Sequence, residues 1–102
     1  FAQGAGARDA ELNLFLGASY FELREYAKAL AAIDRVLKTD PANAYALYNR
    51  ALNYLRLGDA RAAGAFRQYL EVARDDPKQA EYLPLAEQSL RELETAGAPA
   101  KP

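Results

Sequence analysis

The feature of this sequence that most constrains its fold is a motif that occurs twice, about 34 residues apart. The first copy reads Asn13-x-x-Leu16-Gly17-x-x-Tyr20, continues as Ala29-x-x-x-Ile33 and ends with Asp40-Pro41. The second copy reads Leu47-x-x-Arg50-Ala51-x-x-Tyr54, continues as Ala62-x-x-x-Phe66 and ends with Asp76-Pro77. A period of this length indicates a solenoid in which helix-turn-helix units stack on one another.

Apolar residues spaced three and four apart divide the chain into five helices. We expect these helices over residues 10–24, 26–39, 43–57, 60–74 and 78–94. The expected core side of the first helix consists of Leu12, Leu16, Ser19, Tyr20 and Leu23, and that of the second consists of Ala29, Leu30, Ile33, Val36 and Leu37. Residues 1–9 hold two glycines and no helical pattern, which predicts a flexible lead-in. Residues 95–102 are rich in alanine, proline and glycine, which predicts a disordered tail.

Gly17 lies inside the first helix, where glycine costs roughly 0.5–1 kcal/mol relative to alanine. Close approach of the second helix would explain this residue, because Ala29 and Ala32 of that helix are also small. The sequence therefore predicts that Gly17 packs directly against the second helix.

The two copies resemble the tetratricopeptide repeat family. The resemblance is carried by Leu16, Gly17, Tyr20, Ala29 and Pro41 in the first copy, and by Ala51, Tyr54, Ala62, Phe66 and the Gly58-Asp59 turn in the second. It implies an all-α fold, an α-solenoid of two repeats over residues 10–43 and 44–77 that stack in a right-handed superhelix. A fifth helix over residues 78–94 would cap the second repeat. The chain departs from the family pattern at Asn13, Ile33, Val36, Arg50 and Tyr69.

Members of this family bind extended or helical peptides in a concave groove lined by the first helix of each repeat. Projected onto this chain, the candidate binding residues are Leu14, Phe21, Tyr45, Tyr48, Asn49, Leu52, Leu55 and Arg56, with Glu11, Ala18 and Glu22 beside them. These residues lie off the expected core side, and most are apolar or aromatic, as is typical of interaction sites. The resemblance thus implies a scaffold or adaptor module whose partner is a protein or peptide.

Two alternatives concern the partner. Some family members hold the C-terminal carboxylate of a peptide with several lysine, arginine and asparagine residues. Only Asn49 matches that arrangement, because Leu14 and Ala18 stand where a lysine and an asparagine would be expected, so we reject it. In the other alternative, the uncovered side of the first helix or the groove binds a second copy of the chain, so that the module assembles into homo-oligomers. The chain opens with Phe1 rather than methionine, from which we expect a fragment or processed form of a longer protein.

Single residues allow further predictions. We expect Tyr20 and Tyr54 in the core, and Tyr45 and Tyr48 on the surface unless the fifth helix covers Tyr48. Arg50 is equally compatible with bidentate contact to an acidic partner and with a structural role.

Composition argues against several other functions. Thirteen basic residues nearly balance 14 acidic ones, which predicts neither nucleic-acid binding nor attraction to anionic membranes. The chain has no cysteine and no histidine, and so lacks the commonest metal ligand and general base. No apolar run approaches the roughly 18 residues of a membrane span. We therefore expect no catalytic residues, metal or cofactor, and no enzyme activity.

Overall fold

The computed structural model describes residues 2–97, and the side chains of residues 8–96. This part of the chain is all-α, without a β-strand. It forms α1 (Ala2–Glu22), α2 (Tyr26–Thr39), α3 (Ala44–Leu57), α4 (Ala62–Ala73), a short 3₁₀-helix (Pro77–Gln79) and α5 (Leu83–Gly97). The all-α prediction is confirmed, and the bounds of α2 agree with the expected ones.

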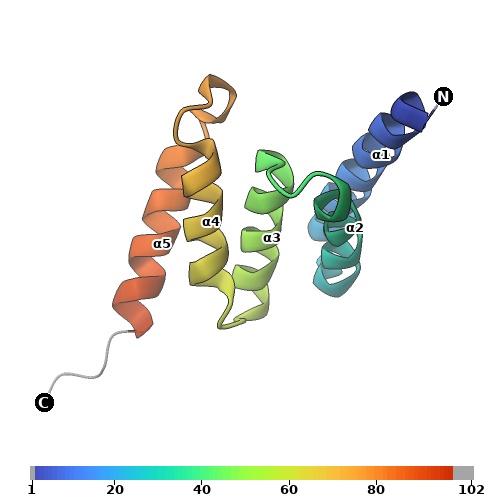
Figure 1. Ribbon diagram of the computed structural model, residues 1–102. Helices are drawn as coiled ribbons and strands as arrows, with labels where there is room; N and C mark the ends of the chain where they lie inside the picture. The colour runs from blue at the N-terminus through green and yellow to red at the C-terminus, as the bar shows by residue number, and fades with distance from the viewer. Residues whose placement is uncertain (1, 98–102) are drawn as a thin grey trace, which may run out of the picture.

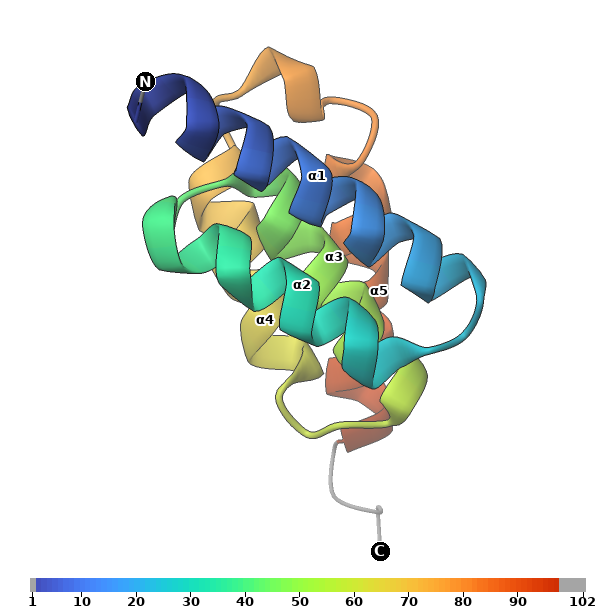
Figure 2. The same cartoon turned by 90° about the vertical axis from the view of Figure 1, so that its right-hand side faces the viewer.

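The helices follow one another across an elongated molecule of 61 × 31 × 20 Å, from α1 at one end to α5 at the other (Figure 1). Each helix packs against the next along the chain, and α1 also contacts α3. Viewed from the α1 end, α1 and α2 lie in front of the other three helices (Figure 2). The helices α1 and α2 therefore form one antiparallel pair, α3 and α4 form a second, and α5 covers the second pair.

Both pairs are joined by the same turn. The amide of Glu25 donates to the carbonyl oxygen of Tyr20 at 2.8 Å. In the second pair, 34 residues later, the amide of Asp59 donates to the carbonyl oxygen of Tyr54 at 2.9 Å. The residue before each of these amides, Arg24 or Gly58, is left-handed, with φ of 62° and 65°. This hydrogen-bond pattern ends a helix with a left-handed residue and turns the chain back on itself.

Gly17 packs directly against α2, as predicted. A Cβ atom at Gly17 would lie 2.5 Å from Cδ1 of Ile33 and 3.7 Å from the carbonyl oxygen of Ala29. Ala29, Ala32 and Ile33 are all fully buried. The glycine therefore makes room for Ile33, and the alanines allow the two helix backbones to approach.

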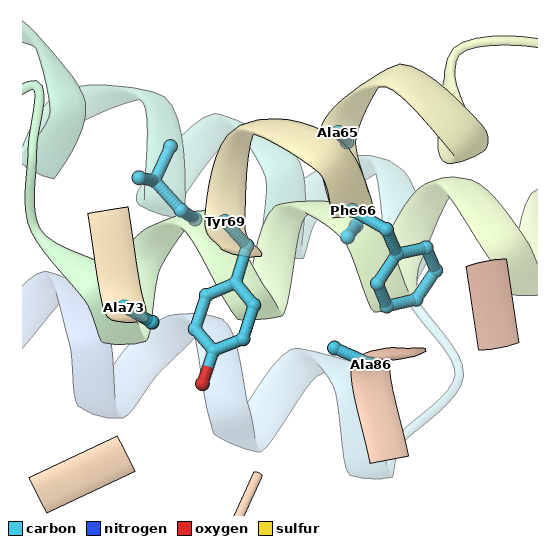
Figure 3. Close-up of a cluster of buried hydrophobic side chains, with 7 residues drawn as sticks. Ala65, Phe66, Tyr69, Ala73 and Ala86 are labelled. Atoms are coloured by element: carbon cyan, nitrogen blue, oxygen red, sulfur yellow. The ribbon is translucent and has the colours of Figure 1, made fainter. Parts of the chain in front are cut away.

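The larger core lies between α3, α4 and α5. Phe66 and Tyr69 project from α4, flanked by Ala65 and Ala73, and Ala86 of α5 lies below the Phe66 ring and beside the Tyr69 ring (Figure 3). The Tyr69 hydroxyl donates to Oε1 of the buried Gln79 at 2.7 Å. Burial raises the pKa of Tyr69 to about 12, because the charged phenolate is disfavoured away from water.

Both chain ends differ from the prediction. The expected flexible lead-in over 1–9 is wrong for residues 2–9, which extend α1 by more than two turns. The expected tail over 95–102 is wrong for residues 95–97, which belong to α5, and residues 98–102 lie outside the described part. Alanine favours helix, and adding residues to an existing helix avoids the unfavourable nucleation step, so these segments continue their helices.

The predicted core side of α1 also needs correction. Leu12 is 55% exposed and Leu23, just beyond the end of the helix, is 66% exposed, although both were expected in the core. Helix α2 instead packs on the side of α1 that holds Gly17, and Leu14 packs against Ile33 and Val36 there. Leu12, Leu23 and Phe15, which is 68% exposed, therefore face away from α2.

Candidate peptide-binding groove

A hollow of about 330 Å³ lies between α1, α3 and the segment before α5. It is lined by Ala18, Phe21 and Glu22 of α1, by Tyr45, Tyr48, Asn49 and Leu52 of α3, and by Tyr82. Residues of α1 and α3 meet here because these two helices contact each other directly as well as through α2. Five of the predicted binding residues, Phe21, Tyr45, Tyr48, Asn49 and Leu52, thus line one surface.

Three tyrosines form one wall of the hollow. The Tyr48 ring lies 5.2 Å from that of Tyr82 and 5.1 Å from that of the buried Tyr69, measured between centroids. Tyr45 meets the edge of Tyr82 at 6.4 Å and is 44% exposed. Burial, and secondly the neighbouring Tyr82, raise the pKa of Tyr48, so its hydroxyl stays protonated to a higher pH than that of an exposed tyrosine. The wall is therefore a rigid aromatic surface with Tyr45 as its exposed part.

Asn49 is the amide in the middle of the hollow. Its Nδ2 donates to the carbonyl oxygen of Tyr45 on the same helix at 2.9 Å, which fixes the side chain. Leu52 lies one turn further along α3 and is half-buried against the core of the second pair. This part of the groove therefore combines an apolar side chain with a fixed polar one.

A second, more polar hollow of about 510 Å³ adjoins the first, and the two share Phe21 and Glu22. Its other lining residues are Arg24, Tyr26 and Arg56. The Arg56 guanidinium lies over the Phe21 ring, 5.6 Å from its centroid, and the edge of Tyr26 meets the same ring at 5.6 Å. We call the two hollows together the groove: an aromatic part at Tyr45, Tyr48 and Tyr82, and a polar end at Arg24 and Arg56.

Two predicted binding residues lie elsewhere. Leu14 packs against Ile33, Val36 and Ala46, where α1, α2 and α3 meet. Leu55 packs against the core of the second pair and lines a separate hollow together with Leu93 of α5. Both positions were projected from the groove of the family that the sequence resembles, whereas in this chain the neighbouring helices cover them. Arg56, the eighth predicted residue, lies at the polar end of the groove.

Three groove residues were missed. Tyr82 lies beyond the second repeat, where a helix over 78–94 was expected; this start is wrong, because the chain forms a 3₁₀-helix at Pro77–Gln79 and α5 begins only at Leu83. Arg24 and Tyr26 lie at the turn between α1 and α2, where sequence analysis placed the ends of two helices and no binding residue. The sequence did contain one sign that position 24 is unusual: the equivalent position of the second copy, 34 residues later, is Gly58.

Predictions were also made for Tyr20, Tyr54 and Arg50, none of which lines the groove. Tyr20 and Tyr54, expected in the core, are half-buried, and the Arg61 guanidinium lies 4.5 Å from the centroid of the Tyr54 ring. Arg50 donates from Nη2 to Oε1 of Gln68 and lines a hollow with Tyr54 and Arg61, apart from the groove. The contacts of Arg50 within the described residues are thus to its own helix pair.

Comparison with known families adds one finding. The family model described as "Tetratricopeptide repeat" matches residues 16–83, from the middle of α1 to the start of α5. Such repeats generally mediate protein–protein interactions and are generally not catalytic. In the described part of the chain, no helix combines the length and apolar character needed to cross a membrane.

Proposed function

Because the chain belongs to the tetratricopeptide repeat family, we propose that it is a non-catalytic module that binds a peptide or helix of a partner protein in its groove. The observation that carries this proposal is the aromatic lining of the groove by two separate helices, α1 and α3, together with Tyr82. A surface of this kind offers apolar area without needing to rearrange, since Tyr48 is already held by Tyr69 and Tyr82.

The size and chemistry of the aromatic part favour a single anchor side chain. A hollow of about 330 Å³ accommodates one or two large apolar side chains rather than a folded domain. Tyrosine contributes a large, rigid contact area with a hydrogen-bonding tip, and interface hot spots are enriched in it. We therefore expect a leucine or aromatic side chain of the partner to lie on Tyr45, Tyr48 and Leu52.

Residue chemistry supports a role without catalysis. The chain has no histidine or cysteine. Tyr48 and Tyr69, the two tyrosines near the groove with shifted pKa values, are both shifted upward, away from the range useful for a base at neutral pH. The groove is therefore suited to binding a side chain rather than to transforming it.

Selection from a random peptide library displayed on phage would test this function. We expect the immobilised protein to enrich peptides that share a large apolar residue, and Tyr45→Ala to weaken their binding by about 30-fold. The matched control is Phe15→Ala, which removes an aromatic ring that is even more exposed than Tyr45, 68% against 44%, and lies outside the groove. Circular dichroism would verify that both variants keep their helices. Equal loss in both variants, or enrichment without an apolar residue, would contradict the proposal.

Self-assembly is the second candidate function, and one observation favours it. Leu12, Phe15 and Leu23 leave more than half of their surface exposed on one end of the molecule. Burial of apolar area there by a second copy would be favourable. Light scattering over a wide concentration range distinguishes the two candidates. A measured mass that stays at 11.2 kDa at every concentration supports binding of a different protein. A mass that rises with concentration in the parent protein but not in the Phe15→Ser variant supports self-assembly.

A further inference from the structure

The turn between α1 and α2 has an arginine at the position where the equivalent turn, between α3 and α4, has a glycine. Arg24 has a φ of 62° and Gly58 has a φ of 65°, and both end a helix through the same pair of backbone hydrogen bonds. Glycine adopts this left-handed conformation freely, whereas an arginine is strained in it because its Cβ is crowded. Residues strained in this way cluster at functional sites, so Arg24 calls for an explanation.

No structural contact among the described residues explains Arg24. Its side chain is exposed and forms no ion pair with them. A cation near the C-terminus of α1 would be favoured by the helix dipole, but a lysine or arginine inside the last turn would serve this purpose without strain. What distinguishes position 24 is that its side chain lines the polar end of the groove.

The polar end contains two arginine side chains and one carboxylate. Arg24 comes from the turn after α1, Arg56 comes from the last turn of α3, and Glu22 of α1 lines the same hollow. The Arg56 guanidinium lies over the Phe21 ring and likewise forms no ion pair with the described residues. Stacking on an aromatic ring holds a guanidinium in place while its N–H donors stay free for a carboxylate.

We propose that the polar end is a subsite for an acidic side chain, an aspartate or glutamate that adjoins the apolar anchor in the bound peptide. This inference rests on the proposed function, because the two hollows share Phe21 and Glu22 and one peptide would occupy both. The carboxylate accepts hydrogen bonds from the guanidinium groups of Arg24 and Arg56, and Glu22 rejects a second acidic residue. The groove thereby reads the order of an apolar and an acidic residue, and so gives the peptide a direction.

Two comparisons test the subsite. First, the peptides that the protein enriches from the phage library should carry aspartate or glutamate at a fixed distance from the apolar residue. Second, one such peptide and its Asp→Asn or Glu→Gln counterpart are compared by fluorescence anisotropy. We expect the protein to prefer the acidic peptide by about fivefold at low salt, in the range of exposed ion pairs, and less at high salt. Arg56→Gln and Arg24→Gly should each reduce this preference to within about twofold.

The control variant is Arg91→Gln, which removes an exposed arginine of α5 that lines neither hollow. It should keep the full preference. Arg24→Gly relieves backbone strain, so its melting temperature should not fall below that of the parent protein. A loss of preference in this variant is therefore a loss of the charge and not of the fold.

The outcomes separate this inference from the proposed function. Peptides enriched for the apolar residue alone, or a preference that survives both arginine changes, would overturn the acidic subsite while the function stands. Binding that is indifferent to Tyr45→Ala, or a library that yields no apolar residue, would overturn both. Preference for a lysine in place of the acid would show that Glu22 and not the arginines governs the polar end.

Discussion

The first helix pair, α1 and α2, and the second, α3 and α4, share one backbone plan but contribute differently to the molecule. In the first pair, a glycine receives Ile33, and Val36 lies a turn further along. In the second pair, Phe66 and Tyr69 take these two positions, 33 residues later, and pack against α5 as well as α3. The same repeat can therefore be stabilised by close backbone approach or by large buried rings.

This difference indicates that stability is not distributed evenly between the two pairs. Within the described residues, the second pair is covered on both sides, by α2 and by α5, whereas the first pair is covered only by α3. The three most exposed large apolar residues, Leu12, Phe15 and Leu23, and the strained Arg24 belong to the first pair or to its turn. We infer that the second pair supplies most of the folding energy together with the aromatic wall of the groove, whereas the first pair contributes Arg24 at the polar end and an exposed apolar surface.

The largest effect should come from the core of the second pair. Phe66→Ala removes a fully buried ring, and we expect it to reduce the free energy of unfolding by about 3–5 kcal/mol. In the first pair, Ile33→Val removes only one methylene from the equivalent position and should cost about 0.5–1.5 kcal/mol. Urea unfolding followed by circular dichroism measures both. A loss below about 2 kcal/mol in Phe66→Ala would contradict a major contribution of this ring to the stability of the second pair.

Gly17 tests the close approach in the first pair. Gly17→Leu places a side chain where even a Cβ lies 2.5 Å from Cδ1 of Ile33, and it should destabilise the protein by about 1–3 kcal/mol through overpacking. The control is Gly64→Ala in the first turn of α4, where a Cβ meets nothing within 4 Å. That change should be neutral or stabilise by up to about 1 kcal/mol, since alanine favours helix.

A second change identifies the contact that Gly17→Leu disturbs. Ile33→Ala on the background of Gly17→Leu removes the atoms that clash, so the two changes together should cost less than the sum of each alone. Strict additivity in the urea experiment would place the leucine somewhere other than against Ile33.

Tyr69 makes the stability of the second pair depend on pH. Its pKa is about 12 in the folded protein, against an ordinary value of 10.0, so the folded state binds the phenolic proton more tightly than the unfolded state does. The contribution is fully present below pH 10 and is lost as the pH rises to 12, by about 1–3 kcal/mol in all.

Urea unfolding at a series of alkaline pH values measures this loss. Tyr69→Phe should flatten the dependence, although Tyr48, whose pKa is also raised, leaves a part of it. The same change should cost about 1 kcal/mol at neutral pH, because Gln79 loses the hydroxyl that donates to its Oε1. An unchanged pH dependence in Tyr69→Phe would mean that Tyr69 ionises as easily in the folded protein as in the unfolded chain.

Sequence reasoning predicted the features that depend on local spacing. The repeat period, the ends of α2 and the contact at Gly17 follow from residue types and their spacing, whereas five residues of the aromatic hollow follow from the groove that the family resemblance implies. It failed where a distant element decides the outcome: α5 covers Leu55, the junction of three helices buries Leu14, and Tyr82 reaches the groove from outside the repeats. It also failed at Leu12, because nothing in the spacing shows which of two apolar sides of α1 receives α2.

The smallest effects concern the left-handed residues of the two turns, Arg24 in the first pair and Gly58 in the second. Replacing each residue by one of the other kind should reverse which of the two turns is strained. Arg24→Gly should stabilise the protein by about 0.5–1 kcal/mol, because glycine adopts a φ of 62° without strain. Gly58→Ala should destabilise it by about 1 kcal/mol, although a Cβ there meets no atom within 4 Å, because the strain comes from the backbone itself. Thermal unfolding of both variants and of the double variant measures these changes. If Arg24→Gly instead lowered stability, the arginine side chain would be contributing to the fold, and its strain would no longer be an argument for a binding role.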